Sequence, residues 1–144
     1  MTDFILTDGD QAVFQPTFGA AMVGVRPGIL RGVGPATLRG KKLCVDGDEQ
    51  KVAVPGCMYQ TPQYSIPGVG TLKIAALAGD QKARKTLSGG KLVLLKGSLF
   101  TAEFEVQNPA LQPPPGSGPP IPDPLAKYTG QGRFITNNTT FQGT

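Results

Sequence analysis

Glycine and proline constrain the fold of this chain more than any other feature of the sequence. The 144 residues include 20 glycines and 14 prolines, roughly twice the usual share of these two residue types. Proline removes a backbone donor and fixes φ, and glycine weakens helices, so a bundle of long helices is excluded. An apolar content of 39% argues against a mostly disordered chain. The length predicts one domain, and the composition favours short strands joined by turns.

The clearest strand signal lies at residues 100–106. Apolar residues at 100, 102, 104 and 106 alternate there with threonine, glutamate and glutamine, which predicts a strand with one buried and one polar face. Residues 92–95 are continuously apolar and predict a strand buried on both faces. We expect these two strands to form a hairpin around Gly97.

Turn residues indicate another hairpin upstream. The Asp-Gly dipeptide at 46–47 lies between two apolar runs, 43–45 and 52–54, a pattern typical of a tight turn between paired strands. One short helix is expected at 81–87, with Asp80 as its cap. Further strands are expected at 4–6, 12–14 and 71–75.

The composition divides the chain into three parts. Residues 1–108 have the pattern of a β-rich body. Residues 109–125 hold 8 of the 14 prolines, and such a run predicts an extended, polyproline-like strap or linker. Residues 126–144 form a polar tail in which apolar residues return, and we expect this tail to dock on the body or on a neighbouring chain. The candidate docking residues are Tyr128, Phe134, Ile135 and Phe141.

The absence of histidine removes many kinds of catalytic and metal site. Histidine is the commonest general base and metal ligand, and the chain contains none. Two cysteines cannot complete a tetrahedral zinc site without further ligands. We therefore assign no catalytic, cofactor-binding or metal-ligating residue. Cys44 and Cys57 are expected to be free buried thiols, although a hairpin that brought them together would allow them to pair.

The net charge of +4 permits nucleic-acid binding without requiring it. An alternative function is therefore a small basic nucleic-acid-binding β-barrel module. Few aromatic residues lie beside the basic ones, so stacking platforms are not evident and no nucleic-acid partner is expected. The basic residues that the nucleic-acid-binding alternative would use are Lys41, Lys42, Lys82, Arg84 and Lys85.

The start of the chain lacks a basic, apolar targeting segment, which predicts synthesis in the cytoplasm without a signal peptide.

Several segments together resemble a known family. They are Phe18-Gly19-Ala20, Cys44-Val45-Asp46-Gly47-Asp48-Glu49, Val54-Pro55-Gly56-Cys57, Ile66-Pro67-Gly68-Val69-Gly70-Thr71-Leu72, Leu95-Lys96-Gly97-Ser98 and Phe104-Glu105-Val106. In this pattern the chain resembles the PAAR-like spike-tip proteins of extracellular contractile injection systems, which are phage-tail-like particles. It lacks a Pro-Ala-Ala-Arg tetrapeptide and the histidines that hold a metal in many such proteins, so a metal is not carried over.

The resemblance implies a small, tapering, all-β tip built from short hairpins in a pseudo-threefold arrangement. It implies a non-enzymatic role at the end of a trimeric VgrG-like spike protein, with one tip copy per spike trimer. It also implies transient contact with the target membrane, and cargo effectors are a further candidate partner. We expect the base of the tip to offer the spike an apolar patch, and the candidate residues are Phe14, Phe18, Phe100, Phe104 and Val106.

Overall fold

The computed structural model describes residues 3–38, 40–114, 116, 118–136, 138 and 142–143. The all-β prediction is confirmed, because the helical content of these residues is a single four-residue 3-10 turn, η1 (Asp48–Lys51). The strands are β1 (Asp3–Phe4), β2 (Gln11–Phe14), β3 (Thr17–Phe18), β4 (Ala21–Val23), β5 (Gly28–Ile29), β6 (Thr37–Leu38), β7 (Lys41–Lys42), β8 (Ala53–Gln60), β9 (Gly68–Ala76), β10 (Lys82–Ser88), β11 (Lys91–Leu94), β12 (Phe100–Asn108), β13 (Leu111–Gln112), β14 (Ile121–Pro122), β15 (Lys127–Ile135) and β16 (Gln142–Gly143).

One antiparallel sheet of eight strands runs along the length of the molecule, in the order β3-β4-β8-β9-β12-β15-β2-β5. The sheet curls, so that Phe18 on the edge strand β3 lies over Gly130 of β15. A Cβ atom at Gly130 would stand 2.7 Å from the Phe18 ring, and the absence of a side chain there permits the close approach. The curled sheet encloses the main apolar core, in which Phe14, Phe100 and Phe134 form successive ring contacts.

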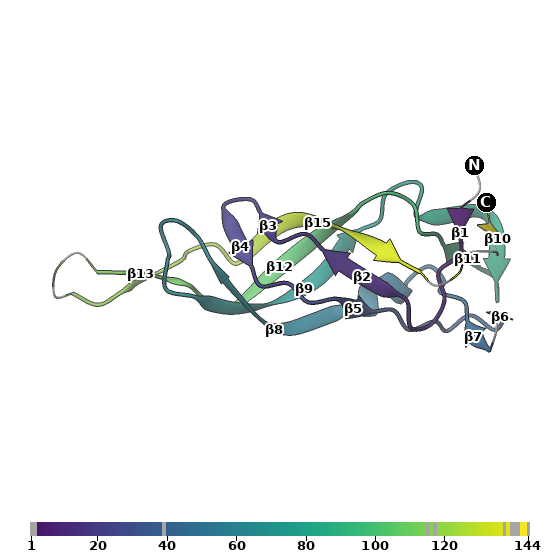
Figure 1. The fold of residues 1–144 in the computed structure, drawn as a ribbon, viewed down its shortest axis with the longest axis horizontal. Coiled ribbons are helices and arrows are strands. Elements are labelled where there is room, and N and C mark those ends of the chain that lie inside the picture. The colour runs from purple at the N-terminus through teal and green to yellow at the C-terminus, as the bar shows by residue number, and fades with distance from the viewer. Residues whose placement is uncertain are drawn as a thin grey trace.

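The molecule tapers from a wide end to a narrow end (Figure 1). The first strand β1 and the last strand β16 lie at the wide end, where two-stranded sheets form: β1 with β16, β6 with β7, and β10 with β11. A smaller apolar cluster packs between these pieces, and it comprises Ile5, Leu43, Val45, Ala83, Val93 and Leu95. The tapering all-β tip expected from the resemblance is thus confirmed, and the pseudo-threefold arrangement stays a prediction.

The proline-rich segment forms the point of the taper. Instead of running as a single strap along the body, it doubles back as the antiparallel pair β13 and β14, with Leu111 opposite Pro122. Leu111 also exchanges two backbone hydrogen bonds with Ile66 in the loop after β8, at 2.9 and 3.0 Å. Proline is tolerated on such two-residue edge strands because few donors are needed there.

Residues 127–135 correct the expectation of a separate C-terminal tail. They form β15, which lies inside the main sheet with β12 on one side and β2 on the other. The proline-rich hairpin is therefore an insertion between two central strands. The hairpin forms the long connection between β12 and β15, which are neighbours in the sheet. Composition alone could not distinguish such a connection from a linker.

Three local predictions are wrong. Residues 82–88 form strand β10 instead of a helix, because the turn at Gly89 and Gly90 (φ 61° and 82°) pairs β10 with β11. The expected partner of β11 was 100–106, but β12 pairs with β9 and β15 instead. Residues 43–45 do not form the expected hairpin with 52–54. They contact the segments around Leu6 and Leu94 instead, because η1 redirects the chain before β8.

Other strand predictions are confirmed. The alternation at 100–106 is strand β12, whose residues at 100, 102 and 104 are buried. The predicted strands at 12–14 and 71–75 lie within β2 and β9, and the one at 4–6 overlaps β1. In the predicted strand at 92–95, Val93, Leu94 and Leu95 are buried as expected, whereas Leu92 is partly exposed.

Candidate functional site: the charge-free narrow end

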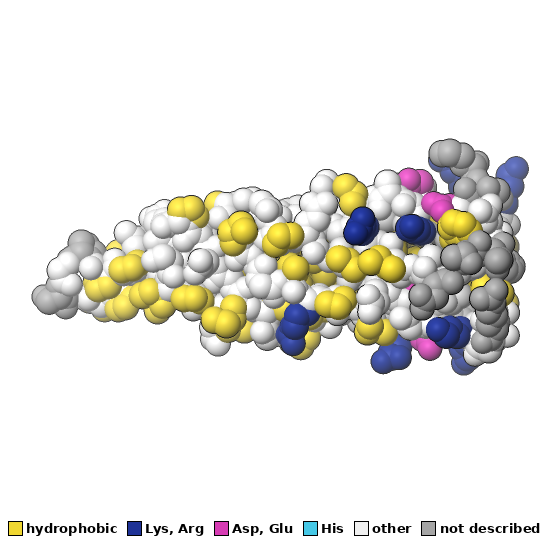
Figure 2. All heavy atoms as spheres, in the orientation of Figure 1, with side chains coloured by type: hydrophobic (Ala, Val, Ile, Leu, Met, Phe, Trp, Pro, Cys, Tyr) yellow, Lys and Arg dark blue, Asp and Glu magenta, His cyan; other side chains and the backbone are white. Residues whose placement is uncertain are grey.

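The narrow end of the molecule presents no charged side chain on the face shown in Figure 2, where Lys, Arg, Asp and Glu all lie in the wider half. The sequence segments that build this end explain the pattern. Residues 11–25 and 52–72 contain no ionisable acid or base of these four types, and residues 106–126 contain one, Asp123. Asp123 is itself buried, with 5% of its surface exposed.

Exposed apolar side chains are spread over the same charge-free segments. Met58 on β8 and Leu125 after β14 each expose more than half of their surface. Hydrophobic residues scattered singly on a surface need no explanation, but here no charge interrupts them. The exposed large apolar residues of this end are Met22, Met58, Ile66, Ile121 and Leu125.

Charges resume at a defined level of the sheet. Lys73 on β9 pairs with Glu105 on β12, with Nζ and Oε2 3.2 Å apart. Lys127, at the start of β15, pairs with Glu103 at 3.5 Å. Glu103 and Glu105 are polar-face residues that the alternation at 100–106 predicted to be solvated. The exposed Arg26 donates to the Pro55 carbonyl on β8 and is a further charge at the limit of the charge-free end.

A buried hydrogen-bond network fixes the root of the β13–β14 hairpin. The hydroxyls of Tyr59 and Tyr128 both donate to Asp123 Oδ2, at 2.9 and 2.5 Å. The backbone N–H of Ala110 donates to the Tyr59 hydroxyl at 2.9 Å, and Leu125 N–H donates to Asp123 Oδ1 at 3.0 Å. Both feet of the hairpin are therefore attached to β8 and β15, and the one carboxylate of this end is fully engaged.

The same network holds the two tyrosines in their neutral form. Burial raises the pKa of Tyr59 to about 12, and its hydrogen bond to Asp123 adds to the effect. Burial also raises the pKa of Tyr128, again with a contribution from the hydrogen bond to Asp123. A neutral hydroxyl can donate to the carboxylate, whereas a phenolate beside it would be repelled.

The structure places the residues expected to contact the spike in or against the main core. Phe14, Phe18, Phe100 and Phe104 are at most 2% exposed and belong to the main core, and Val106 is half-buried against it. An apolar face on an amphipathic strand can cover a core or an interface, and here the curled sheet covers it. These four phenylalanines are structural.

The tail candidates divide between core and surface. Tyr128 and Phe134 on β15 are buried in the main core, and Ile135 is 41% exposed at the end of that strand. Phe141 lies outside the described residues. Tyr128 and Phe134 thus stabilise the sheet as members of a central strand.

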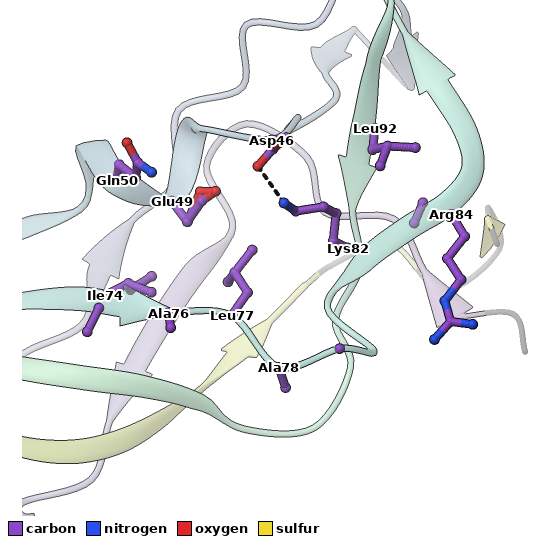
Figure 3. A pocket seen from close by; sticks show the side chains of 13 residues that line it. Asp46, Glu49, Gln50, Ile74, Ala76, Leu77, Ala78, Lys82, Arg84 and Leu92 are labelled. Carbon is purple, nitrogen blue, oxygen red and sulfur yellow. Dashed lines mark ion pairs between the residues drawn. The ribbon is translucent and has the colours of Figure 1, made fainter.

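A hollow of about 590 Å³ opens where the wide end meets the main sheet. Asp46 and Lys82 form an ion pair at its edge, with Nζ and Oδ1 3.0 Å apart. Figure 3 shows this pair and the side chains of Ile74, Ala76 and Leu77 that line the same hollow. No group of three metal-ligating side chains occurs anywhere in the part of the chain that the structure describes. The hollow therefore has apolar side chains on one wall and the Asp46–Lys82 ion pair at its edge.

Both cysteines are free and buried. Burial raises the pKa of the Cys44 thiol, and the nearby carboxylates of Asp48, Asp10 and Asp8 add to the effect. A thiol in this state is a poor nucleophile.

Within the described ranges, no helix has the length and apolarity of a membrane span.

Comparison with known families identifies the chain. The sequence model of the contractile injection system spike tip proteins matches residues 1–144. The chain belongs to this family. The resemblance to spike-tip proteins is therefore confirmed, and membership makes the chain a component of a contractile injection system. No curated protein matches the chain closely enough to indicate a relative.

Sequence reasoning missed the features that distinguish the narrow end. The charge-free runs at 11–25, 52–72 and 106–126 are visible in the sequence, but their common location depends on strand pairing. Asp123 carried a usable signal, because it is the lone acid in a proline-rich segment. An isolated acid in an apolar region is commonly buried with partners.

Proposed function

We propose that this spike tip protein caps a trimeric VgrG-like spike, one copy per three chains, and that its narrow end leads into the target envelope when the particle contracts. The role is structural and requires no catalysis. Membership of the spike tip family supports a position at the spike of a contractile injection particle.

The charge-free surface of the narrow end is the observation that supports this orientation. A lysine, arginine or aspartate at the centre of a bilayer costs about 2.5–3.5 kcal/mol on insertion scales. A leading surface with exposed methionine, leucine and isoleucine and no exposed charge avoids that cost. The opposite end exposes lysine and arginine side chains and would be much more costly to insert.

Paired backbone at the point supports the same orientation. Unsatisfied N–H and C=O groups are costly in hydrocarbon, and β13 and β14 pair with each other and with the loop after β8. The buried Asp123 carboxylate is screened from lipid by the groups that donate to it.

Partition into uncharged lipid tests this proposal. Gln60 and Gln107 are exposed on β8 and β12 in the charge-free end, and the variant Q60E/Q107E places two charges there. The matched variant K41Q/K42Q changes the net charge by the same amount at the wide end. Because the chain lacks tryptophan, partition is measured by flotation with phosphatidylcholine vesicles.

The expected result is that the native chain and K41Q/K42Q float equally, while Q60E/Q107E partitions about tenfold less or worse. Vesicles without net charge remove any attraction between lipid and the basic end. Equal partition of the two variants, or no flotation of the native chain, would contradict the proposed leading end.

A further inference from the structure

We infer that the wide end is a basic docking surface that seats on an acidic end face of the spike. This inference rests on the proposed function. It arises from the balance of exposed charge at the wide end, where most acids are at least partly buried and the exposed bases outnumber the exposed acids.

The acidic side chains of the wide end are used to hold loops. Asp48 Oδ2 accepts hydrogen bonds from the N–H groups of Val45 at 2.9 Å and Val33 at 3.3 Å. Asp10 Oδ2 accepts from Thr7 N–H at 2.8 Å. Asp48, Asp10 and Glu49 are at most 6% exposed, so their negative charge is withdrawn from the surface.

Two more carboxylates serve the same purpose nearer the surface. Asp8 Oδ1 accepts from Gly32 N–H, and Asp3 Oδ2 accepts from Gly97 N–H, each at 2.9 Å. Asp46 is paired with Lys82. Asp46 and Asp80 are nevertheless exposed, so the wide end presents these two acids beside a larger number of exposed bases.

The basic side chains of the same end point to solvent. One of these exposed bases, Lys51, forms an ion pair with Asp48, with Nζ and Oδ1 3.9 Å apart. The others have no carboxylate within ion-pair distance in the part of the chain that is described. The exposed bases are Arg31, Lys41, Lys42, Lys51, Arg84, Lys85, Lys91 and Lys96.

These bases are distributed around the wide end instead of forming one groove. Lys41 and Lys42 lie on β7, while Arg84, Lys85 and Lys91 lie on β10 and β11, on another side of this end (Figure 1). A single tip on a three-chain spike meets three identical surfaces with three different faces of its own. Attraction between spread charges does not depend on detailed shape, so it tolerates this mismatch of symmetry.

Nucleic acid fits this surface less well than an acidic protein face. Single strands are bound by aromatic platforms beside basic residues, and every aromatic side chain that the structure describes is buried or half-buried. The usual footprint for a duplex is a basic stripe along one face or one helix, whereas these bases are divided among β7, the β10–β11 pair and the segments beside them. The favoured partner is therefore a protein surface rich in aspartate and glutamate.

Salt-dependent binding to the recombinant trimeric spike of the same particle tests the inference. Association is measured at about 0.05 M and about 0.5 M salt, which bracket strong and weak screening. The variants are K41Q/K42Q on one side of the wide end and K85Q/K91Q on another. Q60E/Q107E is the matched control, because it lowers the net charge equally at the narrow end. Circular dichroism checks that each variant is folded.

The expected result is one bound copy per three spike chains, with association slowed about tenfold by salt and by each wide-end variant. The control variant should associate like the native chain. Binding that is insensitive to salt and equal for all variants would overturn the basic docking surface and leave the capping role standing. No binding at either salt concentration would overturn the capping role itself. Salt-dependent binding to a DNA duplex, with none to the spike, would overturn the inference in favour of nucleic acid.

Discussion

Removing the Asp123 carboxylate should destabilise the protein more than its single position in a proline-rich hairpin suggests. In Asp123→Ala, the buried hydroxyls of Tyr59 and Tyr128 lose their acceptor, and so does Leu125 N–H. An unsatisfied buried donor costs about 1–3 kcal/mol. Two buried hydroxyls therefore give an expected loss of about 3–4 kcal/mol in the free energy of unfolding, after partial relief by water.

The tyrosine variants should differ from each other in a defined order. Tyr128→Phe removes one donor to Asp123, whose carboxylate keeps two others. Tyr59→Phe removes a donor and also leaves the buried Ala110 N–H without its acceptor. We expect a loss of about 1 kcal/mol for Tyr128→Phe and about 2–3 kcal/mol for Tyr59→Phe.

Urea denaturation followed by far-ultraviolet circular dichroism measures these losses, and limited proteolysis reports local opening of the β13–β14 hairpin. Tyr64→Phe is the matched control, because among the described residues the half-buried Tyr64 has no hydrogen-bond partner for its hydroxyl. An Asp123→Ala variant within about 0.5 kcal/mol of the native chain, with a hairpin cleaved no faster, would show that the buried network does not hold the hairpin.

Two further predictions concern close packing and alkaline pH. A Cβ atom at Gly68 would stand 2.4 Å from backbone atoms of Asn108 and Ala110, so Gly68→Ala should cost more than about 2 kcal/mol. Gly79→Ala, with nothing within 4 Å, should change stability by less than about 0.5 kcal/mol in the same urea titration. The pKa of Tyr59 is raised from 10.0 to about 12 on folding, so its contribution is complete below pH 10 and is lost as the pH rises towards 12, by up to about 1.4 kcal/mol per pH unit. Stability measured between pH 9 and pH 12 should fall less steeply for Tyr59→Phe than for the native chain, and parallel curves would show that this reasoning is wrong.

The sequence was most informative where structure depends on neighbouring residues. The alternation at 100–106 predicted β12 and its polar face, because a strand with one covered face has period two. At 81–87, local signals misled. Asp80 is a good helix cap, but the buried Gln81 side chain accepts a hydrogen bond from Ala78 N–H and donates to the carbonyls of Lys96 and Ser98. These contacts with the segment after β11 favour the strand.

Long-range pairing was beyond the sequence pattern. Nothing near residue 127 indicates that β15 lies between β12 and β2, so the return of apolar residues after the prolines was interpreted as a docking tail. The apolar pattern around Phe14, Phe18, Phe100 and Phe104 likewise predicts a covered face without indicating its partner. An apolar stripe shows that a face is covered, but only the topology shows what covers it.

Electron cryomicroscopy of the assembled spike with its tip gives the copy number and the orientation of the tip together. We expect one copy per three spike chains, with β7 and β10 against the spike and the β13–β14 hairpin farthest from it. A tip whose β13–β14 hairpin is buried in the spike while its basic end points outward would contradict both the proposed capping orientation and the basic docking surface.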